Sequence, residues 1–163
     1  MKRACLLGCV LTLVACGPTE SEGETNLAPG KPEVELGFVH EGQYLPCEPG
    51  SAAPVIWGSQ GGTWVMPVLR TRGVASPTRT EVSLTLAEGE RLGEFEFVYE
   101  LSMTSDAWLE TQSFRVPVQH AAPNQFESIE DVYGKSALIE VRVSDDAERS
   151  ADFSVVITLV EGG

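Results

Sequence analysis

The alternation of apolar and polar residues is the feature that most narrowly limits how this chain can fold. Between Glu94 and Met103, aromatic or other large apolar side chains occupy every second position, and glutamate or serine fills most positions between them. Successive side chains of a β-strand point to opposite faces, so this stretch predicts a strand with one buried and one solvated face. Helical spacing is almost absent from residues 33–160, which predicts an all-β domain.

The same alternation predicts about eight strands. They are expected at 34–39, 54–58, 63–72, 82–86, 94–103, 114–118, 137–143 and 153–159. Pro117 lacks the N–H that a central strand needs, so we expect its strand at an edge or a bulge. Eight strands in roughly 130 residues, separated by turn signals, favour a single antiparallel β-sandwich.

Three connections can be predicted as well. The glycine-rich run 59–62 should be a tight turn between two antiparallel strands. The polar residues 144–150 should join the last two strands in a C-terminal hairpin. Phe126, Ile129 and either Val132 or Tyr133 fall at helical spacing, which predicts one helical turn that crosses from one sheet to the other.

The C-terminal part of the chain resembles a known module. The run from Asp131-Val132-Tyr133-Gly134 through 137–145 to 153–159 is similar to the last two strands of immunoglobulin-like domains. The resemblance implies that residues 33–163 form an immunoglobulin-like β-sandwich. The chain departs from true immunoglobulin domains because it lacks their paired inter-sheet cysteines, and neither Tyr99 nor Tyr133 occupies the tyrosine-corner position.

The N-terminus has the order of a secretory signal. Lys2 and Arg3 precede an apolar stretch, residues 4–14, which is too short to span a bilayer stably. The stretch ends in Leu13-Val14-Ala15-Cys16, which resembles the lipobox of bacterial lipoproteins. The alternative is a plain secretory signal that a cysteine follows by chance.

The lipoprotein resemblance implies a location. It implies a signal peptide over residues 1–15, cleavage before Cys16, and lipid on the thiol and amino group of Cys16. Two or three acyl chains on one residue give lasting attachment, so we expect a protein of the bacterial cell envelope that is lipid-anchored to a membrane. Gly17 stands where enteric lipoproteins retained at the inner membrane carry Asp, which favours the outer membrane.

Residues 17–32 predict a disordered linker that follows the lipidated Cys16. Their sequence, GPTESEGETNLAPGKP, is rich in Gly, Pro, Ser, Thr and Glu and contains one large apolar residue. Such a segment buries too little apolar surface to offset the entropy of ordering it. We therefore expect a flexible tether that holds the domain clear of the lipid headgroups.

The charge of the chain limits its partners. Loss of Lys2 and Arg3 with the signal peptide moves the formal charge from −13 to −15. Nucleic acid is disfavoured as a partner, because binding it depends on Lys and Arg displacing counterions from phosphates. A solvated acidic surface or a basic partner fits this composition better.

Cysteine counting leaves one thiol in the domain. Cys5 and Cys9 leave with the signal peptide and Cys16 takes the lipid, so Cys47 has no partner for an intramolecular disulfide. We expect Cys47 to be buried and inert. Neither His40 nor His120 lies in a motif that would activate it for catalysis.

Motifs for chemistry are weak. The glycine-rich turn lacks the ending of a phosphate-binding loop, and no Gly-x-Ser-x-Gly elbow or paired metal-ligand spacing is present. We expect no cofactor and no enzymatic activity. Asp145, Asp146 and Asp152 could supply oxygens for Ca²⁺ at the C-terminal hairpin, although their spacing matches no EF-hand and solvated turn carboxylates are the ordinary alternative.

Aromatic and basic residues give the remaining candidates. Trp57, Trp64 and Trp108 are expected in the core, but an exposed one near a loop end would be a stacking platform for a protein or carbohydrate. The local basic excess of Arg70, Arg72 and Arg79 would either meet an anionic partner or offset nearby acids.

A second resemblance concerns the segment Gly58–Val65 and the following Arg70-Thr71-Arg72-Gly73. It is similar to a segment of exported lipoproteins of myxobacteria, which implies an envelope location and this fold but no chemistry. We therefore expect a non-enzymatic binding or assembly module. The alternative is a small envelope enzyme, or a carbohydrate-active accessory protein, whose site is built from loops.

Overall fold

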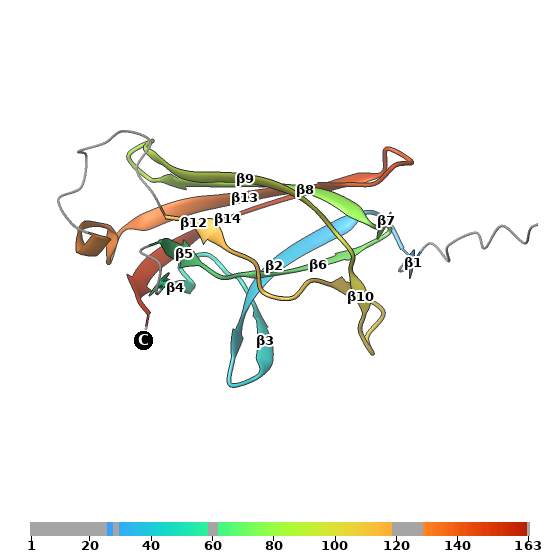
Figure 1. The fold of residues 1–163 in the computed structure, drawn as a ribbon, viewed down its shortest axis with the longest axis horizontal. Coiled ribbons are helices and arrows are strands. Elements are labelled where there is room, and N and C mark those ends of the chain that lie inside the picture. The colour runs from blue at the N-terminus through green and yellow to red at the C-terminus, as the bar shows by residue number, and fades with distance from the viewer. Residues whose placement is uncertain (1–25, 28–29, 59–61, 119–128, 163) are drawn as a thin grey trace, which may run out of the picture.

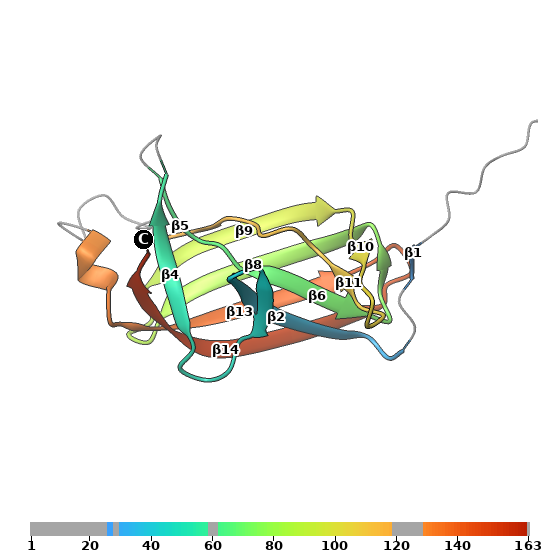
Figure 2. The same cartoon turned by 90° about the horizontal axis from the view of Figure 1, so that it is seen from below.

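The computed structural model describes residues 26–27, 30–58, 62–118 and 129–162. Its strands form two large sheets that pack face to face (Figures 1 and 2), so the predicted all-β sandwich is confirmed. The strand number is higher than predicted, because fourteen strands and one 3-10 turn occupy the described residues. Several of the additional strands are only two residues long, and a strand of that length is too short to show an alternating pattern in the sequence.

The larger sheet has seven strands. Their order is β12 (Val116–Pro117), β5 (Thr63–Val65), β4 (Ala52–Trp57), β14 (Ser150–Glu161), β13 (Ser136–Ser144), β8 (Thr78–Leu86) and β9 (Arg91–Tyr99). Strands β13 and β14 form the predicted C-terminal hairpin, and β4 and β5 form the predicted antiparallel pair. Strand β12 is outermost in this order, which confirms the edge position expected from Pro117.

The smaller sheet has five strands. Their order is β10 (Ser102–Met103), β11 (Leu109–Glu110), β6 (Val68–Arg72), β2 (Glu33–His40) and β3 (Gln43–Pro46). A separate pair joins β1 (Asn26–Leu27) to β7 (Ala75–Ser76). Strand β1 lies inside the segment expected to be a flexible linker, so the chain already pairs with the domain at Asn26.

Three predictions about the connections are wrong. The stretch 63–72 is two strands in different sheets, because it breaks at Pro67, which cannot donate to a ladder. The stretch 94–103 likewise divides between β9 of the larger sheet and β10 of the smaller one. The turn Ile129–Val132 lies between β12 and β13 of the same sheet, so it does not carry the chain across; Phe126 lies outside the described residues.

One pair of neighbouring strands is parallel, so the sandwich is not purely antiparallel as predicted. Strand β4 runs parallel to β14, with Ala52 opposite Thr158 and Val55 opposite Glu161. The chain reaches β4 from β3 of the smaller sheet, so no hairpin fixes the direction in which β4 runs. The parallel pair therefore left no local signal in the sequence.

The core lies between the two sheets and is mainly aliphatic. Its fully buried side chains include Leu36, Leu69, Leu84, Leu109, Ile139, Ile157 and Leu159. The period of two predicted the inward orientation of Leu84, Ile139, Ile157 and Leu159 correctly. It was wrong for Phe95 and Met103 of the predicted strand 94–103, which are 39% and 46% exposed, and Leu109 lies outside every predicted strand. Across the described ranges, no helix has the length and apolar character needed to cross a membrane.

Candidate binding surfaces

Trp57 is a large apolar residue that stands exposed at the end of a strand. It is the last residue of β4 and its side chain is 59% exposed. The Gly58 N–H donates to the Gly62 carbonyl at 2.8 Å, which closes the connection to β5. The expectation of core packing is therefore wrong for Trp57, which stands at a loop end.

Trp64 and Trp108 also lie outside the buried core, each half-buried beneath an arginine. The guanidinium carbon of Arg115 lies 4.9 Å from the Trp64 ring centroid, and that of Arg72 lies 4.6 Å from the Trp108 ring centroid. The core is filled by branched aliphatic side chains, and both indoles instead pack beneath guanidinium groups at its rim. Core packing is thus wrong for these two residues as well.

The packing of Trp64 explains why glycine occupies positions 58 and 62 at the connection between β4 and β5. A Cβ atom at Gly58 would come within 2.0 Å of the Trp64 ring, and one at Gly62 within 2.3 Å. Both positions need glycine because the Trp64 indole lies against the backbone at Gly58 and Gly62. Residues 59–61 of the predicted turn lie outside the described residues. This close packing supports the interpretation of a hairpin turn rather than a phosphate-binding loop.

Trp57 lies at the end of the molecule away from the N-terminal strand. At one end, β1 pairs with β7, and the Ala75 N–H of β7 donates to Asp145 Oδ2 in the β13–β14 turn at 2.9 Å. Strand β14 then runs for twelve residues, about 35 Å, to Glu161, which lies opposite Val55 of β4. Figure 1 shows β1 and β4 at opposite ends of the long axis.

The outer face of the smaller sheet holds its arginines in fixed contacts. Arg70 donates from Nε to Glu110 Oε2 at 2.5 Å and from Nη1 to Asp106 Oδ2 at 3.3 Å. Its guanidinium carbon lies 3.8 Å from the ring centroid of Tyr44. Burial, and secondarily the charge of Glu35, raises the pKa of the Tyr44 phenol well above its ordinary value.

The local basic excess offsets neighbouring acids. Besides the contacts of Arg70, Arg72 forms an ion pair with Glu33, and Arg79 lies 3.3 Å from Glu96 Oε1. Of the two interpretations that the sequence left open, the contacts favour charge compensation within the domain. A separate basic patch for an anionic partner is not formed by these three side chains.

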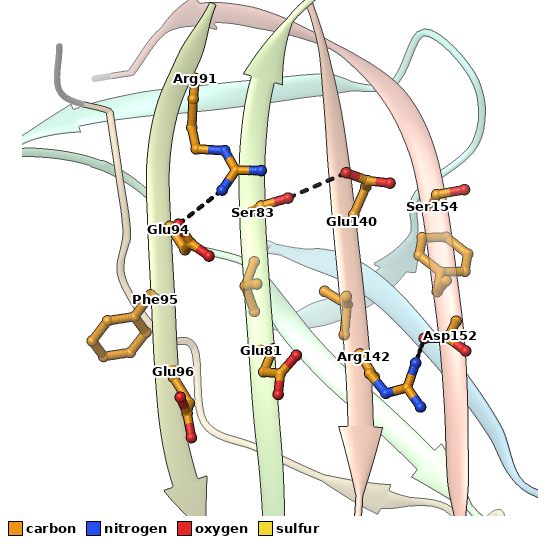
Figure 3. A pocket seen from close by; sticks show the side chains of 13 residues that line it. Glu81, Ser83, Arg91, Glu94, Phe95, Glu96, Glu140, Arg142, Asp152 and Ser154 are labelled. Carbon is orange, nitrogen blue, oxygen red and sulfur yellow. Dashed lines mark hydrogen bonds and ion pairs between the residues drawn. The ribbon is translucent and has the colours of Figure 1, made fainter. Parts of the chain in front are cut away.

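The outer face of the larger sheet is the second candidate surface. A shallow groove of about 520 Å³ crosses strands β9, β8, β13 and β14. Figure 3 shows two rows of polar side chains across these strands; they are Glu94, Ser83, Glu140 and Ser154 in one row and Glu96, Glu81, Arg142 and Asp152 in the next. The alternation had placed the glutamates of β9 on a solvated face, but only the strand register aligns them in rows with the polar side chains of β8, β13 and β14.

The calcium candidates are engaged in contacts of their own. Asp145 accepts hydrogen bonds from the N–H groups of Ala75, Ala147 and Arg149 and pairs with the Arg149 guanidinium. These hydrogen bonds outweigh burial and lower the pKa of Asp145. Asp152 lies 3.4 Å from Arg142, and Asp146 is exposed. Within the described ranges, no three Asp, Glu, His or Cys side chains are placed to hold a metal ion together.

Cys47 is buried with a free thiol, as expected. Burial raises the pKa of the Cys47 thiol to about 11, which keeps it protonated at neutral pH. The Cys47 N–H donates to the carbonyl of Leu36, whereas His40 is exposed four residues further along β2, roughly 13 Å away along the strand. His40 therefore does not form a nucleophile–base pair with Cys47; His120 lies outside the described residues.

Comparison with known proteins gives no assignment. No family model, curated protein or solved structure matches the chain. The exposed Trp57 end and the groove of the larger sheet are thus the two candidate binding surfaces of the domain.

Proposed function

We propose that this chain is a lipid-anchored protein of the bacterial envelope that acts as a non-enzymatic binding module. The lipobox residues Leu13–Cys16 support the anchor, and a diderm outer membrane is its proposed location. The observation that carries the binding role is the exposure of Trp57 at the end of the domain away from the N-terminal strand.

The exposed indole suits recognition. Trp is enriched at interface hot spots because its broad ring buries a large apolar area and its N–H can donate to a polar group of the partner. Trp57 as a residue is 59% exposed, which leaves its indole accessible for stacking on a sugar ring or a protein side chain. The proposed partner is a protein or carbohydrate of the envelope.

The position of Trp57 suits an anchored module. The lipid on Cys16 would hold the β1 end of the domain towards the membrane, because only nine residues separate Cys16 from β1. The Trp57 end lies about 35 Å further out along β14. A ligand could then reach Trp57 without contacting the lipid headgroups.

The anchor is tested by Cys16→Ala in the producing cell. We expect the variant to leave the membrane fraction and to incorporate no labelled fatty acid, because the thioether and the new amino terminus are both lost. A Cys47→Ala variant is the control and should stay membrane-bound. Unchanged membrane association of Cys16→Ala would overturn the anchor.

The binding role is tested by placing a photoreactive aromatic residue at position 57 in the anchored protein. Ala147 is the control position, since it is exposed in the β13–β14 turn at the opposite end. We expect one dominant cross-linked product from position 57, absent from position 147 and competed away by added native protein. Equal cross-linking at both positions, or none at position 57, would contradict the proposed binding end.

A further inference from the structure

The outer face of the larger sheet carries an excess of negative charge that its own arginines do not balance. The groove is lined by five carboxylates, those of Glu81, Glu94, Glu96, Glu140 and Asp152, and by two guanidinium groups. Those guanidinium groups are already directed at Glu94 and Asp152, at 2.8 Å and 3.4 Å. A third arginine of this face, Arg79, lies 3.3 Å from Glu96, so five carboxylates are set against three arginines. A cationic partner would complete the electrostatic balance of this face.

At the β9 side of the groove two carboxylates face each other across neighbouring strands. Glu81 of β8 lies directly opposite Glu96 of β9, an arrangement that is destabilising for like charges in a sheet. Glu96 lies 3.3 Å from Arg79, but no hydrogen bond or ion pair is found for the Glu81 side chain within the described part of the chain. A cation between Glu81 and Glu96 would relieve their repulsion.

Exposed aliphatic side chains stand at two corners of the same face. Val98 of β9 follows Glu94 and Glu96 at the next outward position and is 64% exposed. Val156 of β14 follows Asp152 and Ser154 in the same way and is 44% exposed. The strand and residue spacings of a sheet put these two side chains about 25 Å apart on the diagonal.

From this arrangement we infer that the groove docks an extended, basic segment of a partner protein. Arginine or lysine side chains of that segment would pair with Glu81 and Glu140 and would share Glu96 with Arg79, and apolar side chains near its ends would cover Val98 and Val156. An extended chain of about eight residues spans 25 Å. The carboxylates are spread over neighbouring strands, which suits several cationic side chains better than one metal ion.

This inference concerns a surface other than the Trp57 end, so its test is independent of the proposed function. The probe is a dye-labelled eight-residue peptide with leucine at both ends and three arginines between them. Its binding to the full-length protein in non-ionic detergent is followed by fluorescence anisotropy at low salt. We expect saturable binding that weakens as salt rises.

Matched variants distinguish binding of the peptide in this groove from its attraction to the overall negative charge of the protein. Glu81→Gln with Glu96→Gln should weaken binding at least tenfold, whereas Glu41→Gln with Glu48→Gln, which removes two exposed carboxylates elsewhere, should change it less than twofold. Val98→Ser with Val156→Ser should weaken binding about threefold, and serine in place of the peptide leucines should do the same. Trp57→Ala should have no effect.

Three results would overturn the inference. One is equal weakening by the two glutamate double variants, which would indicate attraction by net charge alone. Another is retention of affinity when glutamate replaces the peptide arginines. The third is a lack of binding to the native protein. All seven substituted positions are exposed, and thermal unfolding of each variant, followed by circular dichroism, should confirm a native-like fold.

Discussion

The outer faces of the two sheets use the same residue types in different ways. On the smaller sheet, Arg70 is stacked on Tyr44 and paired with Glu110, and its side chain is only 19% exposed. On the larger sheet, Arg91 is 51% exposed and contacts Glu94 at the rim of a groove with more carboxylates than arginines. The charged side chains of the smaller sheet are partly buried in contacts with one another, whereas those of the larger sheet remain exposed to solvent.

The difference indicates where charge stabilises the domain and where it is free for a ligand. A guanidinium held between an aromatic ring and a partly buried carboxylate gains from both contacts and loses little to solvent screening. Exposed ion pairs contribute little, with measured values of roughly 0–1 kcal/mol. We therefore expect substitutions on the smaller sheet to lower stability and substitutions around the groove to leave it almost unchanged.

The largest effect is expected from Gly37→Ala in β2. A Cβ atom there would come within 2.4 Å of the Leu45 carbonyl oxygen and 2.5 Å of the Tyr44 ring, so the backbone of β3 or the ring beneath Arg70 must shift. We expect a loss of about 2–3 kcal/mol in the free energy of unfolding, measured by urea denaturation. Ser154→Ala on the groove face is the control and should stay within about 0.5 kcal/mol. An unchanged midpoint for Gly37→Ala would show that this face is not closely packed.

Cys47 reports on the same closed region. Its thiol has a pKa of about 11 in the folded chain, so at pH 8 we expect a maleimide to label native protein about a hundredfold more slowly than urea-unfolded protein. Burial favours the neutral thiol, so its contribution to stability is full below the ordinary pKa near 9 and is lost as pH rises through about 11. The unfolding midpoint should therefore fall more steeply over this range in the native chain than in Cys47→Ala. Rapid labelling of the folded protein would argue against a closed region.

Two arginine substitutions compare the faces directly. Arg70→Ala removes the stack on Tyr44 and leaves Glu110 without its cation, so we expect a loss of about 1–2 kcal/mol. Arg91→Ala removes one exposed ion pair and should cost less than about 0.5 kcal/mol. Urea denaturation of both variants gives the comparison, and equal losses would refute the distinction between the faces.

How far the sequence predicts this molecule depends on the range of the interaction concerned. Alternation within one strand assigned inward residues correctly in the central strands, as in Ile139 of β13 and Ile157 of β14, because it depends only on local geometry. It failed at Phe95, which is 39% exposed because its strand, β9, is at the edge of the sheet. It could not show that the chain changes sheets at Pro67 or that β4 runs parallel to β14, since neither leaves a local pattern.

The candidate sites follow the same rule. Burial of Cys47 was predicted from residue type, but the position of Trp57 at an exposed strand end depends on where β4 terminates. The groove depends on the register that sets Glu81 beside Glu96, residues fifteen positions apart in the chain. A search for acidic residues on the solvated faces of predicted neighbouring strands could have found part of it.

The comparison between the faces is tested most directly by two double variants that remove the same charge. Glu33→Gln with Glu110→Gln takes the carboxylates from the arginines of the smaller sheet, and we expect a loss of about 1 kcal/mol in the free energy of unfolding. Glu81→Gln with Glu96→Gln removes the facing carboxylates of the groove, and stability should stay the same or rise by up to about 0.5 kcal/mol. Equal losses in both variants would contradict the account, because the carboxylates of the groove would then serve the fold rather than a ligand.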